Sequence, residues 1–370
     1  MKYRIIAAVA AAAFSILFPL VIASANSTKG SGAEIVNEAQ AVISAEKSGT
    51  EETADTSAET ANTSANTSAD TSAADVPVSQ TGEDASVTVR VLMDDGTITP
   101  MTLHNYLIGV VAAEMPATFE PEALKAQSVA ARTYTLYKMK VHPSANHPDA
   151  DVCTDNSCCS AYIGDEELQQ SWGDNYDRYL AKITSAVEDT DGIIALYDSK
   201  PILAVFHSSS TAMTEDSANV WSQSVPYLKS VASGETADEV NNYVVTVTIA
   251  ADDFYGTIRD SLGGDTSAAD LAAAQVTADY SPSGRLVTLH LGDAEISGTE
   301  LRSLFDLRST AMDIQFSDTE ITITTTGYGH GVGLSQYGAN DMALKGSTYD
   351  EILCWYYTDI RLGYISDCAS

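Results

Sequence analysis

Hydrophobic and polar positions follow three successive patterns along the chain. An apolar run at 5–22 comes after two basic residues and ends in an Ala-Ser-Ala sequence. Residues 26–85 are rich in Ser, Thr, Ala and acidic residues, and DTSA and NTSA recur there without hydrophobic periodicity. Periodic hydrophobic patterns begin near Ser86, so we predict one folded region over 86–370.

The first 25 residues are typical of either a signal peptide or a membrane anchor. The Ala-Ser-Ala ending suits cleavage, whereas an apolar length of about 20 residues suits a bilayer span, and on length we favour a single-pass anchor. In both cases the basic flank stays in the cytoplasm and the rest is exported. We therefore predict a cell-membrane protein with an extracytoplasmic folded region. Residues 26–85 would be a disordered tether, because their composition cannot offset chain entropy.

The folded region mixes helical and extended patterns without a regular βαβ alternation, which indicates an α+β fold around one catalytic cleft. Apolar spacing and turn residues predict helices at 103–113, 121–138, 176–188 and 298–307. Period-two alternation predicts strands at 86–93, 97–103, 193–197, 202–207, 240–250, 285–292 and 320–326. A division that makes 236–318 a smaller inserted lobe is compatible with this pattern.

Glu114 is a candidate catalytic acid. An apolar run at 106–113 leads into Glu114-Met115-Pro116, and proline disfavours helix at the residue before it. A carboxyl group there would face the negative end of the helix dipole among apolar neighbours. Both effects raise its pKa, as a proton-donating acid requires. The alternative is a surface glutamate at a helix end.

Lys125, Ser128 and Arg132 share one face of the next predicted helix. A cationic stripe on this face would bind sugar hydroxyls or stabilise developing charge beside an acid. The alternative is an ordinary solvated helix face.

His147, Cys153 and Cys159 lie within 13 residues of one another and form a three-ligand set of the kind that zinc prefers. The fourth position is open to Cys158, another histidine, a carboxylate or water. The alternative in an exported protein is a disulfide, but we favour zinc.

The net charge of −32 argues against nucleic-acid binding, because such a field repels phosphates. The segment GYGHGVGLSQYGA at 327–339 lacks Walker and G-x-G-x-x-G spacing, so we predict no nucleotide cofactor. Its alternating glycines allow close backbone approach, and a glycine-lined floor carrying His330 and Gln336 suits an uncharged glycan. The alternative is a strand packed tightly under a helix.

Together these segments resemble the stage II sporulation protein D family, which has amidase-enhancer relatives. The resemblance spans about Ser86 to Leu362 and is carried by YLIGVVAAEMP, EALKAQSVAARTY, CCSAY, FHSSS, VPYLKSV, ISGTELRSLFDLRST and GYGHGVGLSQYGA. The chain departs from the family pattern at Thr211, Ala212 and Met213, where members usually carry paired glycines and a histidine. If those glycines adopt positive φ, the loop would be strained here.

The resemblance implies a lytic transglycosylase that acts on peptidoglycan glycan strands during forespore engulfment. It further implies Glu114 as the catalytic acid, Lys125, Arg132, Tyr227 and Lys229 in substrate binding, and His147, Cys153 and Cys159 as ligands of a structural zinc. Stage II sporulation proteins P and M would be partners at the membrane. Two rival functions are a glycan-binding activator of a cell-wall amidase and a muramidase-type hydrolase.

Overall fold

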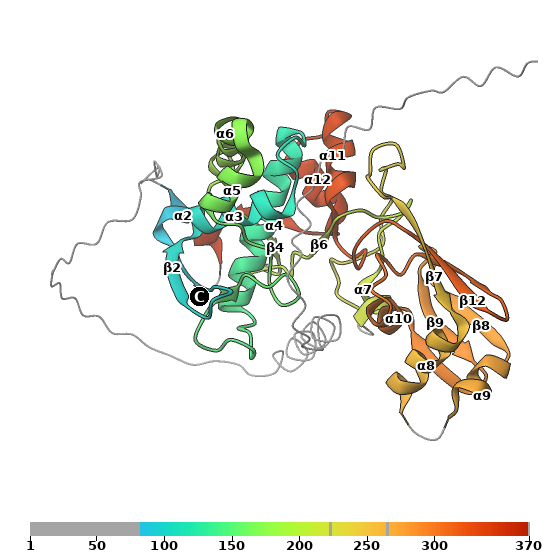
Figure 1. Cartoon of the computed structure of the whole chain (residues 1–370). Coiled ribbons are helices and arrows are strands. Elements are labelled where there is room, and N and C mark those ends of the chain that lie inside the picture. The colour runs from blue at the N-terminus through green and yellow to red at the C-terminus, as the bar shows by residue number, and fades with distance from the viewer. Residues whose placement is uncertain (1–81, 222–223, 264–265, 369–370) are drawn as a thin grey trace, which may run out of the picture.

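A computed structural model describes residues 82–221, 224–263 and 266–368 (Figure 1). The predicted anchor at 1–25 and most of the predicted tether at 26–85 lie outside these ranges. Within the described ranges, no helix is long and apolar enough to cross a membrane. The tether was predicted to extend to residue 85, but the folded region begins earlier. Helix α2 (Glu83–Ser86) starts before that limit, and Asp84 is fully buried.

Helix α4 (Pro121–Lys140) is the central helix of the larger lobe (Figure 1). Proline occupies its first turn, and its alanines are fully buried, which lets neighbouring elements approach closely. The helices that pack around it are α3 (Leu103–Glu114), α6 (Tyr176–Glu188), α11 (Gln336–Leu344) and α12 (Tyr349–Tyr356). Shorter helices are α5 (Asp165–Trp172), η1 (Gly173–Asn175), α7 (Ser217–Trp221) and η2 (Ile365–Asp367).

Small sheets border these helices. Strands β1 (Thr88–Leu92) and β2 (Ile98–Thr102) form an antiparallel hairpin, and β3 (Val152–Cys153) pairs parallel to β1. A second sheet has the order β14 (Arg361–Tyr364), β4 (Ile193–Tyr197) and β5 (Lys200–Pro201). The predicted strand at 202–207 is wrong in its extent, because the hairpin turns tightly at Asp198 and Ser199 and its return strand ends at Pro201.

The smaller lobe has its own hydrophobic core and lies beside the larger one (Figure 1). One of its sheets has the order β11 (Met312–Phe316), β12 (Glu320–Thr326), β7 (Val244–Ala250), and the other β10 (Ala294–Ser297), β9 (Leu286–Leu291), β8 (Val276–Tyr280). Its helices are α8 (Ala251–Leu262), α9 (Ala268–Ala273) and α10 (Gly298–Leu304). The predicted limit at 318 would cut the β11–β12 hairpin, so the lobe extends to the end of β12.

The glycine-rich segment after β12 returns the chain to the larger lobe. It leads into β13 (Leu334–Ser335), which pairs parallel to β6 (Phe206–His207). Gly327, Gly329, Gly331 and Gly333 all have positive φ. A Cβ atom on Gly333 would lie 2.2 Å from the Val205 carbonyl oxygen, so only glycine allows this approach. The predicted glycine-lined ligand floor is therefore covered here by the protein's own backbone, which is closer to the alternative of tight internal packing.

Candidate active site and metal cluster

Glu114 is the last residue of α3. The helix ends there because Met115 is extended, with φ −128° and ψ 135°, and Pro116 follows. The Glu114 carboxylate is partly exposed and accepts two hydrogen bonds from distant parts of the chain. Oε1 accepts the backbone N–H of Ala161 at 2.8 Å, and Oε2 accepts Nε2 of Gln336 at 3.5 Å.

Two opposing effects set the pKa of Glu114. Burial raises it from 4.5 to about 7, while the Ala161 and Gln336 donors pull it down. The predicted direction of the shift is therefore confirmed, with burial as its main cause. Within the described residues no second carboxylate contributes to this pKa. Glu114 can thus hold a proton near neutral pH and, once it has lost the proton, can be stabilised by two neutral donors.

Gln336 reaches Glu114 because the start of α11 is fixed. Ser335 caps this helix by accepting the Gly338 N–H at 3.4 Å, and its hydroxyl donates to Glu235 at 2.5 Å. Gly338 leaves room for the Tyr356 hydroxyl, which a Cβ atom there would approach to 2.0 Å. Among the predicted substrate-binding residues, Gln336 is the one that the structure brings to Glu114.

The predicted open cationic stripe on α4 is wrong. Ser128 and Arg132 are fully buried, and Arg132 forms an ion pair with the equally buried Asp84 at 2.6 Å. Lys125 is bound to Glu122 at 3.0 Å and to Asp189 at 3.1 Å. The solvated-face alternative fails as well, because this face is covered by α2 and by the residues after α6.

Tyr227, Lys229 and His330 also have internal partners. Tyr227 is buried and its hydroxyl accepts the Leu203 N–H at 3.0 Å. Lys229 is partly exposed and pairs with Asp216 at 3.3 Å. Nδ1 of His330 accepts the Val332 N–H at 3.0 Å, and its ring also interacts with the Phe206 carbonyl. Burial lowers the pKa of His330 to about 3, so this ring is neutral and held by backbone.

The loop at 211–213 is unstrained. Thr211, Ala212 and Met213 are not among the residues with positive φ, so the glycines usual at these positions are not required by this backbone. The neighbouring His207 is buried and its Nδ1 donates to the Val332 carbonyl at 3.1 Å. No serine of the FHSSS segment has a hydrogen bond to His207 within the described chain.

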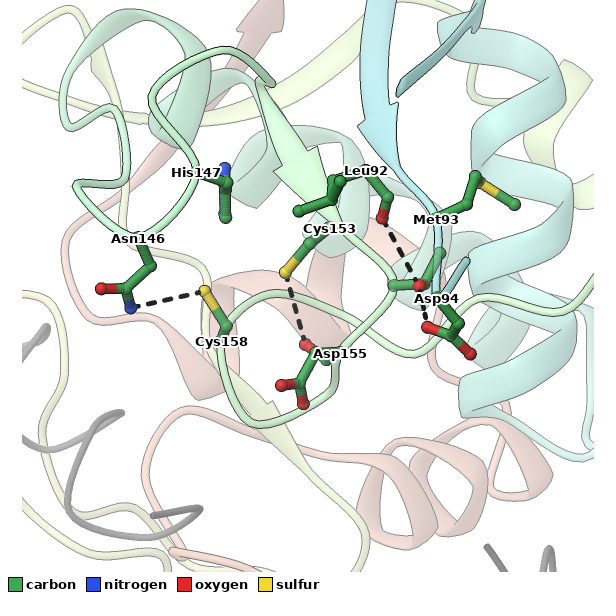
Figure 2. Close-up of a pocket in the computed structure, with 9 residues that line it drawn as sticks. Leu92, Met93, Asp94, Asn146, His147, Cys153, Asp155 and Cys158 are labelled. Atoms are coloured by element: carbon green, nitrogen blue, oxygen red, sulfur yellow. Dashed lines mark hydrogen bonds between the residues drawn. The ribbon is translucent and has the colours of Figure 1, made fainter. Parts of the chain in front are cut away.

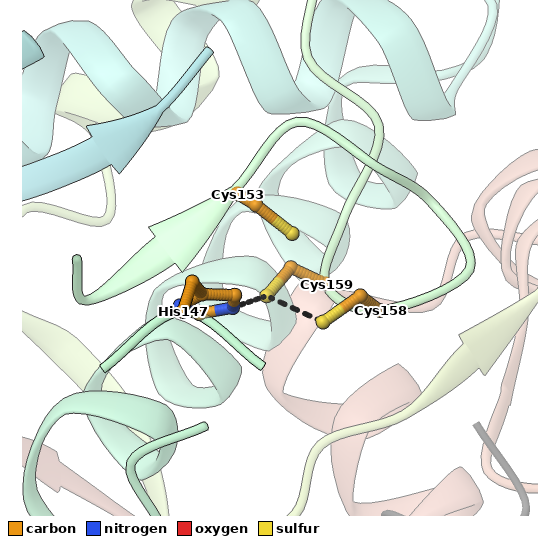
Figure 3. Close-up of side chains that lie close together, drawn as sticks. All are labelled: His147, Cys153, Cys158 and Cys159. Atoms are coloured by element: carbon orange, nitrogen blue, oxygen red, sulfur yellow. Dashed lines mark hydrogen bonds between the residues drawn. The ribbon is translucent and has the colours of Figure 1, made fainter. Parts of the chain in front are cut away.

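Figure 3 shows four side chains converging in the loop after α4: His147, Cys153, Cys158 and Cys159. Their ligand atoms all lie within 4.8 Å of one another. Nε2 of His147 is 3.4 Å from Sγ of Cys159, and the Cys158 and Cys159 sulfurs are 4.0 Å apart. Tetrahedral zinc with Zn–S bonds of about 2.3 Å separates its sulfur ligands by about 3.8 Å. The cluster therefore fits a metal ion, and all five cysteines are free of disulfides.

The chemistry around the cluster also suits a cation. Nδ1 of His147 donates to the Ala150 carbonyl at 3.2 Å, which leaves Nε2 as a ligand atom. Hydrogen bonding among the three thiols lowers the pKa of Cys158 and raises those of Cys153 and Cys159, because the protonated thiols stabilise a thiolate at Cys158. The buried Lys138 ammonium also favours the Cys158 thiolate.

A pocket of about 400 Å³ opens beside the cluster (Figure 2). The residues that line it include Asp94, Thr154, His147, Cys153 and Cys158. Nδ2 of Asn146 lies 4.0 Å from Sγ of Cys158 at its edge. The pocket gives an ion from solvent access to the ligand atoms.

The cluster is joined directly to the environment of Glu114. Ala161, whose N–H binds the Glu114 carboxylate, follows Cys159 by two positions. The next residue, Tyr162, stacks on Tyr106 of α3 with ring centres 5.8 Å apart. A Cβ atom on Gly109 would lie 2.4 Å from the Tyr162 ring, so glycine is required there. Holding the cysteine loop in place therefore also holds the donor to Glu114.

Comparison with known proteins gives the family. A family model described as "Stage II sporulation protein" matches residues 94–197. Stage II sporulation protein D of Bacillus subtilis (strain 168) is 38% identical over 260 residues, which cover 70% of this chain and 74% of that protein. This chain belongs to the stage II sporulation protein D family. The family member from Bacillus amyloliquefaciens is 36% identical over the same shares, and the "Amidase enhancer" of Bacillus subtilis is 29% identical over 69% of this chain and 40% of that protein.

Sequence reasoning missed several groups at this site. The Ala161 amide could not be singled out, because a backbone donor has no residue-type signal, although Ala161 lies within the CCSAY segment. Cys158 was left as one of several fourth ligands. Asp84 was assigned to the tether, yet it neutralises Arg132.

Proposed function

We propose that this chain is a lytic transglycosylase that cleaves the bond between N-acetylmuramic acid and N-acetylglucosamine in peptidoglycan strands. The observation that carries the proposal is a single, largely desolvated carboxyl group, Glu114, whose pKa of about 7 suits both giving and taking a proton. Family membership supports a role in sporulation, and the amidase-enhancer relative supports the cell wall as its setting.

In the first step, protonated Glu114 donates its proton to the glycosidic oxygen as the bond from the muramyl C1 to that oxygen breaks. The developing Glu114 carboxylate is stabilised by the donors already in place, the Ala161 N–H and the Gln336 side chain. The low polarity that raises its pKa favours proton transfer at neutral pH.

In the second step, the Glu114 carboxylate takes the proton of the muramyl C6 hydroxyl as that oxygen bonds to C1. The product carries a 1,6-anhydro ring, and Glu114 regains its proton. Ordinary glycosidases use two carboxyl groups because water or the enzyme supplies the nucleophile. Here the substrate supplies it, which agrees with the absence of a second carboxylate acting on Glu114 in the described residues.

We further propose zinc as the ion of the His147, Cys153, Cys158 and Cys159 cluster. One nitrogen and three sulfur ligands complete a tetrahedral set, which is typical of structural zinc sites. Such an ion would hold the loop that carries Ala161, and no step of the reaction passes through it.

The proposed setting is the cell membrane, with the folded region outside the cytoplasm. An N-terminal anchor and tether would hold the enzyme close to the wall, in contact with stage II sporulation proteins P and M. These assignments rest on the N-terminal sequence and on the family.

The test is to incubate the protein with glycan strands freed of stem peptides and to analyse the products by mass spectrometry. We expect 1,6-anhydro ends, and a Glu114→Gln protein should form at least 100-fold less product. Glu166→Gln, at an exposed position of α5, is the matched control and should keep full activity. Reducing ends in place of anhydro ends would show a muramidase-type hydrolase, and activity in Glu114→Gln would refute the assignment of the acid.

The second candidate function is a glycan-binding activator of a cell-wall amidase, favoured by the relative named amidase enhancer. It predicts strand binding without new chain ends, and a higher rate of a purified amidase when this protein is added. Under this function Glu114→Gln would leave the stimulation unchanged.

A further inference from the structure

Arg308 lies over an exposed aromatic ring where the smaller lobe meets the glycine-rich segment. Its Cζ atom is 4.1 Å from the centre of the Tyr328 ring, and Tyr328 is 45% exposed. The Arg308 carbonyl accepts the Gly329 N–H at 2.9 Å, which fixes its backbone. Stacking of this kind leaves the edge of a guanidinium free to donate hydrogen bonds in its own plane.

Among the described residues, this arginine has no acidic partner. Arg90, Arg132 and Arg259 each pair with an aspartate, whereas no carboxylate lies within ion-pair distance of Arg308 in the described ranges. Its Nε is buried without a hydrogen-bond partner. The chain has 51 acidic residues against 19 Lys and Arg, so a partly exposed arginine left unpaired indicates that its partner comes from outside the chain.

Other cations of the smaller lobe strengthen the field at this point. Arg285 is 1% exposed and its Nε and Nη1 have no hydrogen-bond partner. Arg302 donates to the Leu307 carbonyl at 3.1 Å and also acts on Tyr328. Arg308 and Arg302 thus both act on one exposed tyrosine, and neither forms an ion pair within the described residues.

Arg308 acts electrostatically on a residue that lies next to the Gln336 donor of the catalytic acid. Arg308 lies close enough to Tyr337 to oppose the rise in its pKa that burial causes. Tyr337 follows Gln336, whose side chain donates to Glu114 at 3.5 Å, and its ring contacts Phe119 at 4.9 Å between ring centres. An anion bound by Arg308 would therefore be carried by a sugar close to the bond that is cleaved.

We propose that Arg308, supported by Tyr328, binds a carboxylate of the glycan, and that this carboxylate is the lactyl group of a muramyl residue. The inference rests on the proposed function. In a strand with stem peptides the lactyl group is an amide, whereas removal of the peptide leaves a free carboxylate on the sugar ring. Stem carboxylates lie several bonds further from the ring. Arg308 is thus a specificity-determining residue that distinguishes stripped from peptide-bearing muramyl units.

The test measures binding, not cleavage, with full-length Glu114→Gln protein by calorimetry. The ligands are stripped glycan strands, the same strands with lactyl carboxylates converted to methylamides, and strands with intact stem peptides. We expect the stripped strands to bind about tenfold more tightly than the methylamides, as one charge-assisted contact implies. In the Glu114→Gln protein, a second substitution Arg308→Gln should abolish the difference in affinity between stripped and methylamide strands. Arg308→Lys should keep part of that difference.

The controls distinguish this role from a structural one. Affinity for the methylamide strands should be the same with and without Arg308→Gln, which also shows that the fold is intact. Arg259→Gln, on α8 of the same lobe, should leave all affinities unchanged. If the Glu114→Gln protein that keeps Arg308 binds stripped and methylamide strands with equal affinity, the inference about Arg308 is overturned and the proposed function is not. Tightest binding of peptide-bearing strands, lost in Arg308→Gln, would overturn the lactyl source. Failure to bind any strand would overturn the proposed function with it.

Discussion

Replacing Glu114 with glutamine should stabilise the protein at alkaline pH while it removes the catalytic proton. Burial raises the pKa of folded Glu114 to about 7 from its ordinary value of 4.5. Between these two values the unfolded chain has lost the proton that the folded protein still holds. The unfolded state therefore binds fewer protons, and the free energy of unfolding of the native protein falls as the pH rises. Glutamine at this position has no proton to lose.

The magnitude follows from the two pKa values. Their difference of about 2.5 corresponds to about 3 kcal/mol at 1.36 kcal/mol for each pH unit. Because the side chain is partly exposed, solvent screening reduces this to about 2–3 kcal/mol. The stability that neutral Glu114 contributes is present in full below pH 4.5 and is lost as the pH rises through about 7. The free energy of unfolding of Glu114→Gln, relative to that of the native protein, should therefore rise between pH 4.5 and about pH 7 and stay constant above about pH 7.

Urea unfolding followed by tryptophan fluorescence provides the assay. All three tryptophans, Trp172, Trp221 and Trp355, belong to the larger lobe, which also carries Glu114. The quantity of interest is the difference in unfolding free energy between the two proteins from pH 4 to pH 8.5. For the exposed control Glu166→Gln, the difference in unfolding free energy from the native protein should change little over the same pH range. If the difference in unfolding free energy between Glu114→Gln and the native protein does not change with pH, the claim that folding raises the pKa of Glu114 is refuted.

Three further predictions test other parts of the site. Formation of anhydro products should fall about tenfold for each pH unit above about 7, as Glu114 loses its proton, and a rate that rises to pH 9 would contradict this. Cys158→Ser should lower bound zinc, measured by elemental analysis, and stability together, while Cys354→Ser changes neither; equal zinc in both would exclude Cys158 as a ligand. Asp84→Asn should cost about 3–5 kcal/mol by leaving Arg132 buried and unpaired, against below about 1 kcal/mol for Asp260→Asn in an exposed pair; similar costs in urea unfolding would contradict the buried pair.

Local sequence rules predicted the backbone around the acid. Pro116 fixed the end of α3 at Glu114, and a proline followed by alanines predicted α4. These features depend on neighbours within a few residues, where propensity and sterics act directly. The candidate metal group of His147, Cys153 and Cys159 was recognised for the same reason, since these residues lie in one short loop. Whether Cys158, another histidine, a carboxylate or water takes the fourth position depends on the course of that loop, so the sequence left it open; the structure places Cys158 beside the other three.

Side-chain partners could not be predicted in this way. The periodicity of α4 placed Lys125 and Arg132 on one face, but it carried no information about what covers that face. The cover is Asp84, 48 positions earlier in the chain. The donor Gln336 lies 222 positions from Glu114, and its approach depends on the β6–β13 pairing and on glycines that fit against other backbone.

The sequence by itself determined the family, the α+β character, the end of α3 at Glu114 and the grouping of histidine and cysteines. Each of these is written in residues that are close together or in motifs that occur as a unit. The tertiary structure alone decided that burial raises the pKa of Glu114, that Arg132 is internal and that Arg308 has no ion-pair partner within the described residues. Burial and ion pairing depend on which distant segments meet, and that is fixed only when the two lobes and their connecting glycine segment have packed.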